Sequence, residues 1–135
     1  MMDIEKVWQN SIDEVTNYDR DADGYVYAIE LEVIGSEADT ETHLYVGQTK
    51  RDVKQRVEEH ISGQFEYKKD VPDPSGGNNN SPYEVVRVDY IESIFQEEMD
   101  ILGWGIEQEL AYLESEAGRN YAKYDNRFDK IIGAK

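Results

Sequence analysis

Residues 44–60 read LYVGQTKRDVKQRVEEH, and this stretch is expected to contain the end of a strand and most of a helix. The segment HLYVG, which supplies its first residues, is predicted to pair with an earlier strand. Thr49 and Asp52, three residues apart, resemble the capping box that opens many helices. A helix is therefore expected from about Lys50 to Ser62, directly after the strand.

The same stretch gathers positive charge. It holds four of the fourteen lysines and arginines in a chain of formal net charge -16, namely Lys50, Arg51, Lys54 and Arg56. Positive charge concentrated at one place in an acidic chain indicates a local role, because the chain as a whole repels anions.

The apolar residues of the expected helix define its buried face. Val53, Val57 and Ile61 recur at helical spacing, and two polar residues lie at the edge of that face, about 60° and 20° from Val53: Arg56 and His60. Two interpretations stay open. Arg56 can simply extend along the apolar surface with its charge in water, and His60 can be a hydrogen-bonded histidine beside the core. Alternatively, both residues serve a functional site.

The remaining patterns predict one α+β domain over residues 1–135. Residues 25–33 alternate with a period of two and predict a strand, which the polar segment GSEADTET joins to HLYVG as a hairpin. Residues 83–91 predict a third strand. Helices are expected at 3–17 and at 94–117, the second interrupted by two glycines, and the Pro/Gly/Asn-rich stretch 71–82 predicts a mobile loop. The expected fold is a small three-stranded antiparallel sheet flanked by helices.

Four residues and their spacing resemble the GIY-YIG nuclease superfamily. Tyr27 in GYVYAI, Tyr45 in LYVGQT, and Arg56 with His60 in RVEEH match its two tyrosine-bearing hairpin strands and the helix that follows them. The resemblance covers residues 24–120. It departs from the family pattern at three points: Tyr-Val-Tyr stands where Gly-Ile-Tyr is expected, the hairpin turn is long, and Gln48 occupies a position where some members carry lysine.

The resemblance implies an endonuclease that hydrolyses phosphodiester bonds in nucleic acid, with DNA as the expected substrate. It assigns the activation of water to a tyrosine, Tyr27 or Tyr45, and a phenol with an ordinary pKa near 10 needs nearby positive charge to act as a base at neutral pH. Arg56 is expected to bind the phosphate in the transition state, because its planar guanidinium matches phosphate and stays charged. His60 is expected to assist proton transfer or to orient the phosphate.

The resemblance also implies one divalent ion, Mg²⁺ or Mn²⁺, held by a glutamate of the last helix. Glu107 and Glu109 both lie at an edge of its apolar face, and we favour Glu107 because its spacing to Asn120 is closer to that of the family. Four other carboxylates are expected to form a solvated face: Glu97, Glu98, Glu114 and Glu116. Four residues are expected to contact the nucleic acid: Lys50, Arg51, Lys54 and Asn120.

A second metal motif overlaps the first strand. Asp19, Asp21, Asp23 and Glu30, with Gly24 between them, satisfy the D-x-D-x-D-G-x5-E pattern of calcium-binding loops. However, residues 25–33 alternate like a strand, and no second such loop appears for the usual pairing. A turn that leads into the strand is therefore expected, and Ca²⁺ binding is kept as the lesser alternative.

Composition bears on the remaining classes of protein. Thirty acidic residues are spread along the whole chain and lysine is sparse, a pattern typical of halophiles, where salt screens self-repulsion. There are no cysteines, no secretory signal pattern and no apolar run near the roughly 18 residues of a membrane span, so a cytoplasmic protein is expected. Oligomeric state is not predictable from these patterns. A GIY-YIG-like module that binds nucleic acid or protein without cutting remains the alternative to an enzyme, since a fold does not guarantee activity.

Overall fold

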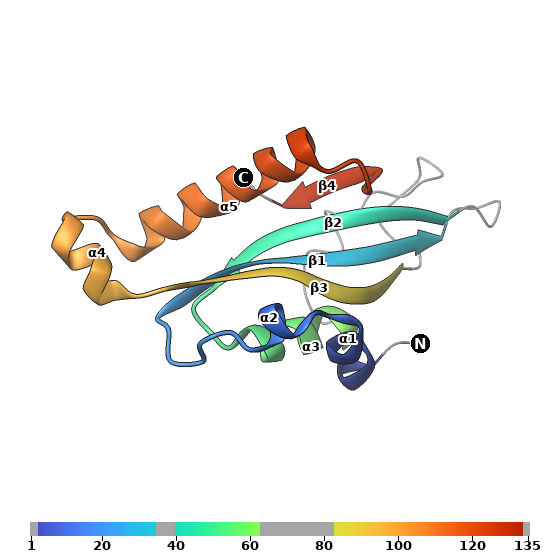
Figure 1. Ribbon diagram of the computed structural model, residues 1–135, viewed down its shortest axis with the longest axis horizontal. Coiled ribbons are helices and arrows are strands. Elements are labelled where there is room, and N and C mark those ends of the chain that lie inside the picture. Colours follow the sequence, from blue (N-terminus) through green and yellow to red (C-terminus); the bar gives the residue numbers. More distant parts are fainter. Residues whose placement is uncertain (1–2, 35–39, 63–82, 134–135) are drawn as a thin grey trace.

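A four-stranded mixed sheet forms the centre of the molecule in the computed structural model, which describes residues 3–34, 40–62 and 83–133 (Figure 1). The strands are β1 (Gly24–Ile34), β2 (Thr40–Thr49), β3 (Tyr83–Ile94) and β4 (Lys130–Gly133), in the spatial order β3-β1-β2-β4. β1 pairs antiparallel with both β2 and β3, whereas β4 runs parallel to β2. The predicted hairpin is confirmed and the three predicted strands pair antiparallel, while β4 adds a fourth strand that was not predicted.

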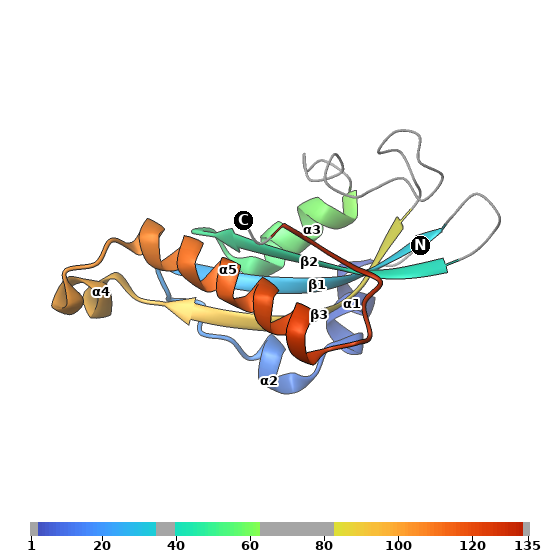
Figure 2. The ribbon, with the colours of Figure 1, turned by 90° about the horizontal axis from the view of Figure 1, so that it is seen from above.

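Helices cover the two faces of this sheet. α1 (Ile4–Asn10), α2 (Asp13–Thr16) and α3 (Val53–Ser62) lie on one face, and α5 (Ile106–Tyr124) lies across the other (Figure 2). α4 (Gln96–Leu102) projects beyond the end of the sheet. None of the helices in the described ranges is long and apolar enough to cross a membrane.

The side chains of β1 alternate between two apolar clusters. Tyr25, Tyr27 and Ile29 pack in the cluster on the α3 side, together with Val53 and Val57. On the opposite face, Val26 and Ala28 pack in a second cluster that includes buried apolar residues of α5: Ile106 and Leu110. Because both faces of β1 are buried, its sequence is apolar at almost every position rather than at every second one.

The helices differ from the predicted ranges at their ends. The expected helix 3–17 is divided in two at Ser11, whose hydroxyl donates to the carbonyl of Val7 at 2.8 Å and accepts from the amide of Val88 at 2.9 Å. The expected helix 94–117 is also two helices, because Gly103 ends α4 with a left-handed φ of 67° and residues 83–94 form β3. The break at Ser11 therefore depends on its contact with β3, and the end of α4 depends on the turn at Gly103.

The predicted capping box does not form at the start of α3. The hydroxyl of Thr49 accepts from the amide of Arg51 at 3.0 Å, and the side chain of Asp52 accepts instead from the hydroxyl of Tyr18. α3 consequently begins at Val53, three residues later than expected. Its apolar seam is as predicted, since Val53 and Val57 are fully buried.

A strand occupies the segment where a calcium loop would enter its second helix. β1 begins at Gly24 and includes Glu30, which forms an ion pair with Arg87 at 3.6 Å. Oδ1 of Asp19 accepts from the amide of Asp21, and Oδ2 of Asp23 accepts from the amide of Gln96. These carboxylates hold a turn, as the preferred interpretation predicted. The expected mobile loop, 71–82, lies outside the described residues.

Candidate functional site

Gly47 makes room for two tyrosines on the α3 face of the sheet. Tyr27 on β1 is paired with Gly47 on β2, and the rings of Tyr27 and Tyr45 are 6.4 Å apart. A Cβ atom at position 47 would lie 2.9 Å from the hydroxyl of Tyr27 and 2.8 Å from Cε1 of Tyr45. Both distances are too short for a real Cβ atom, so position 47 must be a glycine for the Tyr27 hydroxyl to lie across β2.

His60 completes this cluster from α3. Its Nε2 lies 2.8 Å from the hydroxyl of Tyr27, and its ring centroid is 5.0 Å from that of Tyr45. Tyr27 and His60 have no exposed surface, and Tyr45 is 8% exposed. The sequence placed these three residues in one site, and in the structure they do lie together.

Burial is the main cause of the pKa shifts of Tyr27 and His60. Burial and then the neighbouring Tyr45 raise the pKa of Tyr27, while Arg56 opposes this shift through its charge and a hydrogen bond. Burial and then the charge of Arg56 lower the pKa of His60 to about 3, so this imidazole is neutral at pH 7. An arginine can only donate, so the Tyr27 oxygen accepts from Arg56. The proton of the Tyr27 hydroxyl is then directed to Nε2 of His60.

Arg56 lies beside the tyrosine with its side chain 20% exposed. Its Nη1 donates to Oε1 of Glu59 at 3.1 Å, and Glu59 also receives a two-pronged contact from Arg51, at 2.7 and 2.8 Å. Glu59 therefore links the two arginines. Arg56 can contact an anion at the site while Arg51 remains bound to the carboxylate.

Glu114 is buried, contrary to the prediction from sequence. It was expected on a solvated face, but it is only 9% exposed, and its Oε2 accepts from Nε2 of Gln48 at 2.7 Å. After burial and Tyr45, the charge of Glu114 also raises the pKa of Tyr27, although α5 lies on the opposite face of the sheet. β4 pairs with β2 only as far as Val46, so Gln48 lies on a part of β2 that β4 does not cover.

Helical spacing contained a signal for Glu114. The buried residues of α5 recur at every fourth position: Ile106, Leu110, Glu114 and Gly118. A carboxylate in an otherwise apolar row must either be neutralised or find partners, because a buried unpaired charge is costly. Glu114 has such a partner in Gln48.

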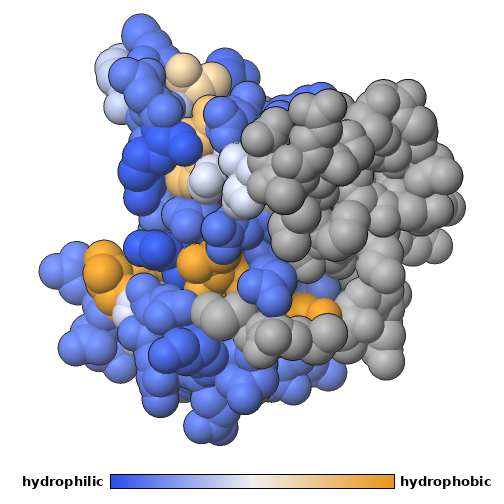
Figure 3. All heavy atoms as spheres, turned by 90° about the vertical axis from the view of Figure 1, so that its right-hand side faces the viewer, coloured by the Kyte–Doolittle hydropathy of each residue, from blue (hydrophilic) through white to orange (hydrophobic). Residues whose placement is uncertain are grey.

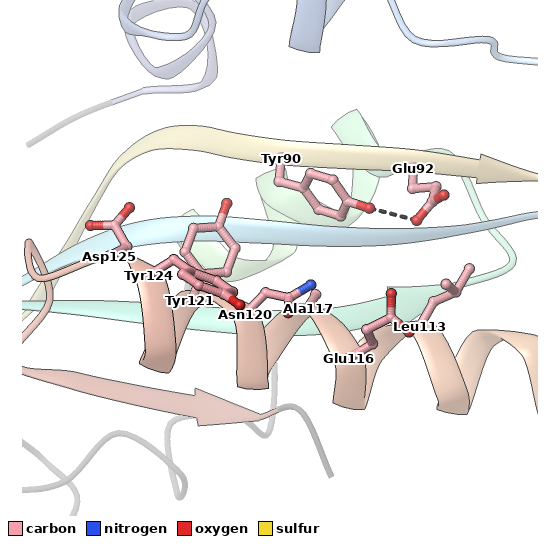
Figure 4. Close-up of a pocket in the computed structure, with 9 residues that line it drawn as sticks. All are labelled: Tyr90, Glu92, Leu113, Glu116, Ala117, Asn120, Tyr121, Tyr124 and Asp125. Carbon is pink, nitrogen blue, oxygen red and sulfur yellow. Dashed lines mark hydrogen bonds between the residues drawn. The ribbon is translucent and has the colours of Figure 1, made fainter.

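Three of the residues favoured for metal or nucleic-acid binding lie elsewhere on α5. Glu107 is exposed and forms an ion pair with Lys50, whose hydrogen bond and charge lower the pKa of Glu107. Glu109 is half-buried on the same helix. Asn120 lines a cavity between α5 and β3, beside Tyr90 (Figure 4). Asn120 is thus on the opposite face of the sheet from Tyr27 and His60.

The remaining basic residues of the opening stretch have partners within the chain. Lys50 is bound to Glu107 and Arg51 to Glu59, while the ammonium of Lys54 lies 5.6 Å from the centre of the Trp8 ring. Lys50 and Arg51 are exposed. Both are therefore accessible to a polyanion from solvent at the end of the sheet where β2 leads into α3.

The donor set is compatible with a single-carboxylate metal site. No group of three or more His, Cys, Asp or Glu side chains is arranged to hold an ion within the described ranges. A hexacoordinate Mg²⁺ needs only one or two protein carboxylates, since water and substrate phosphate supply the other oxygens. Glu114, part-buried and with a charge that acts on the pKa of Tyr27, fits this requirement better than Glu107, whose carboxylate is already bound to an ammonium group.

Comparison of the sequence with profiles of protein families and with curated proteins, and of the structure with solved structures, finds no match. The chemistry of the site is therefore the basis for a functional proposal.

Proposed function

We propose that this chain is a metal-dependent endonuclease of GIY-YIG type that hydrolyses phosphodiester bonds in nucleic acid, with DNA as the expected substrate. The observation that carries the proposal is the 2.8 Å contact between Tyr27 and His60, with Arg56 beside it. The three residues come from β1 and α3, so the fold has to bring them together. A buried core needs neither an arginine nor a histidine at this place.

Each side chain has a role in such a reaction. The guanidinium of Arg56 contacts phosphate oxygens and stabilises the negative charge that develops on them. Tyr27 is the base that activates water, and neutral His60 accepts the hydrogen bond of the phenol and orients it. Burial raises the pKa of Tyr27, so the loss of its proton needs additional positive charge at the site.

A divalent ion, Mg²⁺ or Mn²⁺, would supply that positive charge and polarise the phosphate. We propose Glu114 as its carboxylate ligand, in preference to Glu107 or Glu109. Glu114 is part-buried, and its charge acts on Tyr27. Gln48 orients the carboxylate by donating to Oε2.

Cleavage assays with Mg²⁺ or Mn²⁺, on a panel of DNA and RNA structures in molar KCl, test the enzyme. Arg56→Ala should lower the cleavage rate by ~10² to 10³ with nearly unchanged binding, the loss typical of one preorganised electrostatic group. Lys54→Ala should instead weaken binding and cut normally at saturation. Arg56→Lys should restore little, because a single ammonium group cannot reproduce the two-pronged contact.

Three matched substitutions test the metal ligand. Glu114→Gln should abolish metal-dependent cleavage, whereas Glu107→Gln and Glu109→Gln, with the same change of charge on the same helix, should retain it. Circular dichroism confirms that each variant is folded. Loss of cleavage in Glu107→Gln alone would show that Glu107, which the sequence spacing favours, is the metal ligand. Loss in Glu109→Gln alone would show that Glu109 is the ligand.

Complete burial of Tyr27 and His60 favours a second candidate, a module that keeps this fold and binds nucleic acid without cutting it. In that case Arg56, Lys50, Arg51 and Lys54 form a docking surface. A folded wild-type chain that binds the nucleic acid panel and cuts none of its members with either metal would favour the binding module.

A further inference from the structure

A cavity of about 300 Å³ lies between β3 and α5, on the face of the sheet opposite Tyr27 and His60. Its walls are three tyrosines, two small apolar side chains, an amide and three carboxylates (Figure 4). They are Tyr90, Tyr121, Tyr124, Leu113, Ala117, Asn120, Glu92, Glu116 and Asp125. A cavity of this size can enclose a small organic molecule.

Two of these carboxylates have no basic partner in the part of the chain that the structure describes. Asp125 is bound to Arg127 at 2.8 Å, and Arg127 also holds Asp89 nearby. Within the described ranges, Glu92 accepts a hydrogen bond from Tyr90 and Glu116 accepts one from Tyr112. Two negative charges on opposite walls, one from β3 and one from α5, are therefore left without compensation.

The tyrosines place electron-rich rings at the walls of the same space. Tyr90 donates to Oε2 of Glu92 at 2.5 Å, and Tyr121 donates to Oδ2 of Asp89 at 2.6 Å. Burial, and then the bond to Glu92 and the charges of Glu92 and Glu116, raise the pKa of Tyr90. Both phenols consequently stay protonated, and their oxygens and ring faces can only accept from a ligand.

Neighbouring basic groups of the chain already use this chemistry. The guanidinium of Arg127 lies 4.8 Å from the centre of the Phe128 ring while it binds two aspartates, and Lys123 lies 5.2 Å from the centre of the Tyr124 ring. Aromatic rings therefore accompany both cations near the cavity, and Arg127 combines a ring with carboxylates. The cavity repeats this combination around an open space.

We infer that this cavity is a binding site for a short alkyl diammonium cation. One ammonium group pairs with Glu92 on β3 and the other with Glu116 on α5, so both uncompensated charges are neutralised. The alkyl chain between them lies along Leu113, Ala117 and the tyrosine rings, and the amide oxygen of Asn120 accepts a further N–H. A quaternary ammonium would leave these hydrogen-bond acceptors without a donor.

Isothermal titration calorimetry with 1,4-diaminobutane tests this site on the full chain. Butylamine, with one charge, should bind at least about tenfold more weakly, and butane-1,4-diol should not bind, because an ion pair with a part-buried carboxylate contributes about that much. Glu92→Gln and Glu116→Gln should each lower the affinity for the diamine at least about tenfold. Glu97→Gln on exposed α4, with the same change of charge, should leave it unchanged.

Amide chemical shifts of the wild-type chain locate the ligand independently of these variants. Diaminobutane should shift Glu92, Ala117 and Asn120 and leave Glu97 unmoved. Equal affinity in Glu92→Gln, Glu116→Gln and wild type, or shifts spread over the acidic surface, would overturn the site and indicate a diffuse counterion. Neither measurement depends on cleavage, so the result is separate from that of the proposed nuclease.

Discussion

Gly47 illustrates how a single missing side chain defines the candidate site. β2 presents side chains at its neighbouring positions, and only a bare position opposite Tyr27 leaves space for a phenol. The hydroxyl then reaches Nε2 of His60, and Gln48, one residue further, reaches Glu114. The sequence motif Tyr-Val-Gly-Gln thus has a geometric reason at its third position.

Gly47→Ala should destabilise the protein by about 1 to 3 kcal/mol, because its methyl group forces Tyr27 and Tyr45 from their packed positions. Urea denaturation measures the change in the free energy of unfolding. Gly105→Ala is the control, since its Cβ would meet only the flexible end of Gln108, at 3.1 Å. An equal effect of the two substitutions would show that the tyrosines adjust without cost.

His60 should make stability depend on pH below neutrality. Its pKa is about 3 in the folded chain and close to 6.5 when unfolded, so between these values only the unfolded chain binds the proton. The stabilising contribution is complete above pH 6.5 and is lost as the pH falls towards 3, by up to about 5 kcal/mol. Urea denaturation of wild type and His60→Gln across this range should give curves that converge at low pH. Parallel curves would contradict the low pKa.

At the residue scale, the sequence predicted those site residues whose positions follow from local periodicity. Arg56 and His60 lie at the edge of a seam that Val53 and Val57 define, and this relation needs only helical geometry. The burial of Glu114 was missed because it depends on Gln48, 66 residues earlier, and on which row of α5 faces β2. Glu107 and Glu109 were predicted from their spacing along the sequence. This spacing does not show which side chains are buried.

At the element scale, β4 shows the same limit. β1 and β2 could be predicted because they are neighbours in sequence with a polar turn between them, whereas the four residues of β4 pair with β2 across most of the chain. Two contacts fix its start: the amide of Asp129 donates to the carbonyl of Thr42 at 2.7 Å, and its carboxylate accepts from the amide of Thr42 at 2.8 Å. A short KIIG segment has no local pattern that reveals such a partner.

Ile132→Ala should therefore destabilise the whole domain and not only its edge. Ile132 is 7% exposed and packs in the cluster of Tyr27 and Tyr45, so its truncation should lower the free energy of unfolding by about 2 to 4 kcal/mol. Lys130→Ala, on an exposed residue of the same strand, should change it little. Chemical denaturation measures both, and equal stability of Ile132→Ala and wild type would show that β4 is peripheral.

At the scale of the whole molecule, negative charge is the dominant property. The formal net charge is -16, and most described arginines are already bound to carboxylates within the chain. The surface reflects this composition, because the described part of the end opposite α4 is mostly hydrophilic (Figure 3). Like charges on one small body repel one another, and this repulsion is relieved on unfolding.

The melting temperature should accordingly rise with KCl, as the halophile-like composition of the sequence predicts. The Debye length falls from about 30 Å at 0.01 M to about 3 Å at 1 M, so screening extends to ever closer pairs of charges over this range. Differential scanning calorimetry at several KCl concentrations measures the effect. A melting temperature that stays flat or falls over the same range would contradict charge repulsion as the main destabilising force.

The central position of β1 has a consequence for the lifetime of the site. β1 is bonded on both edges, to β2 and to β3, and its amides can exchange with deuterium only when one of these ladders separates. Such openings require nearly the full free energy of unfolding, whereas the projecting α4 can open locally at little cost. Tyr27 is carried on β1, so its contact with His60 should persist through the frequent small openings of the molecule and disappear only in the rare global ones.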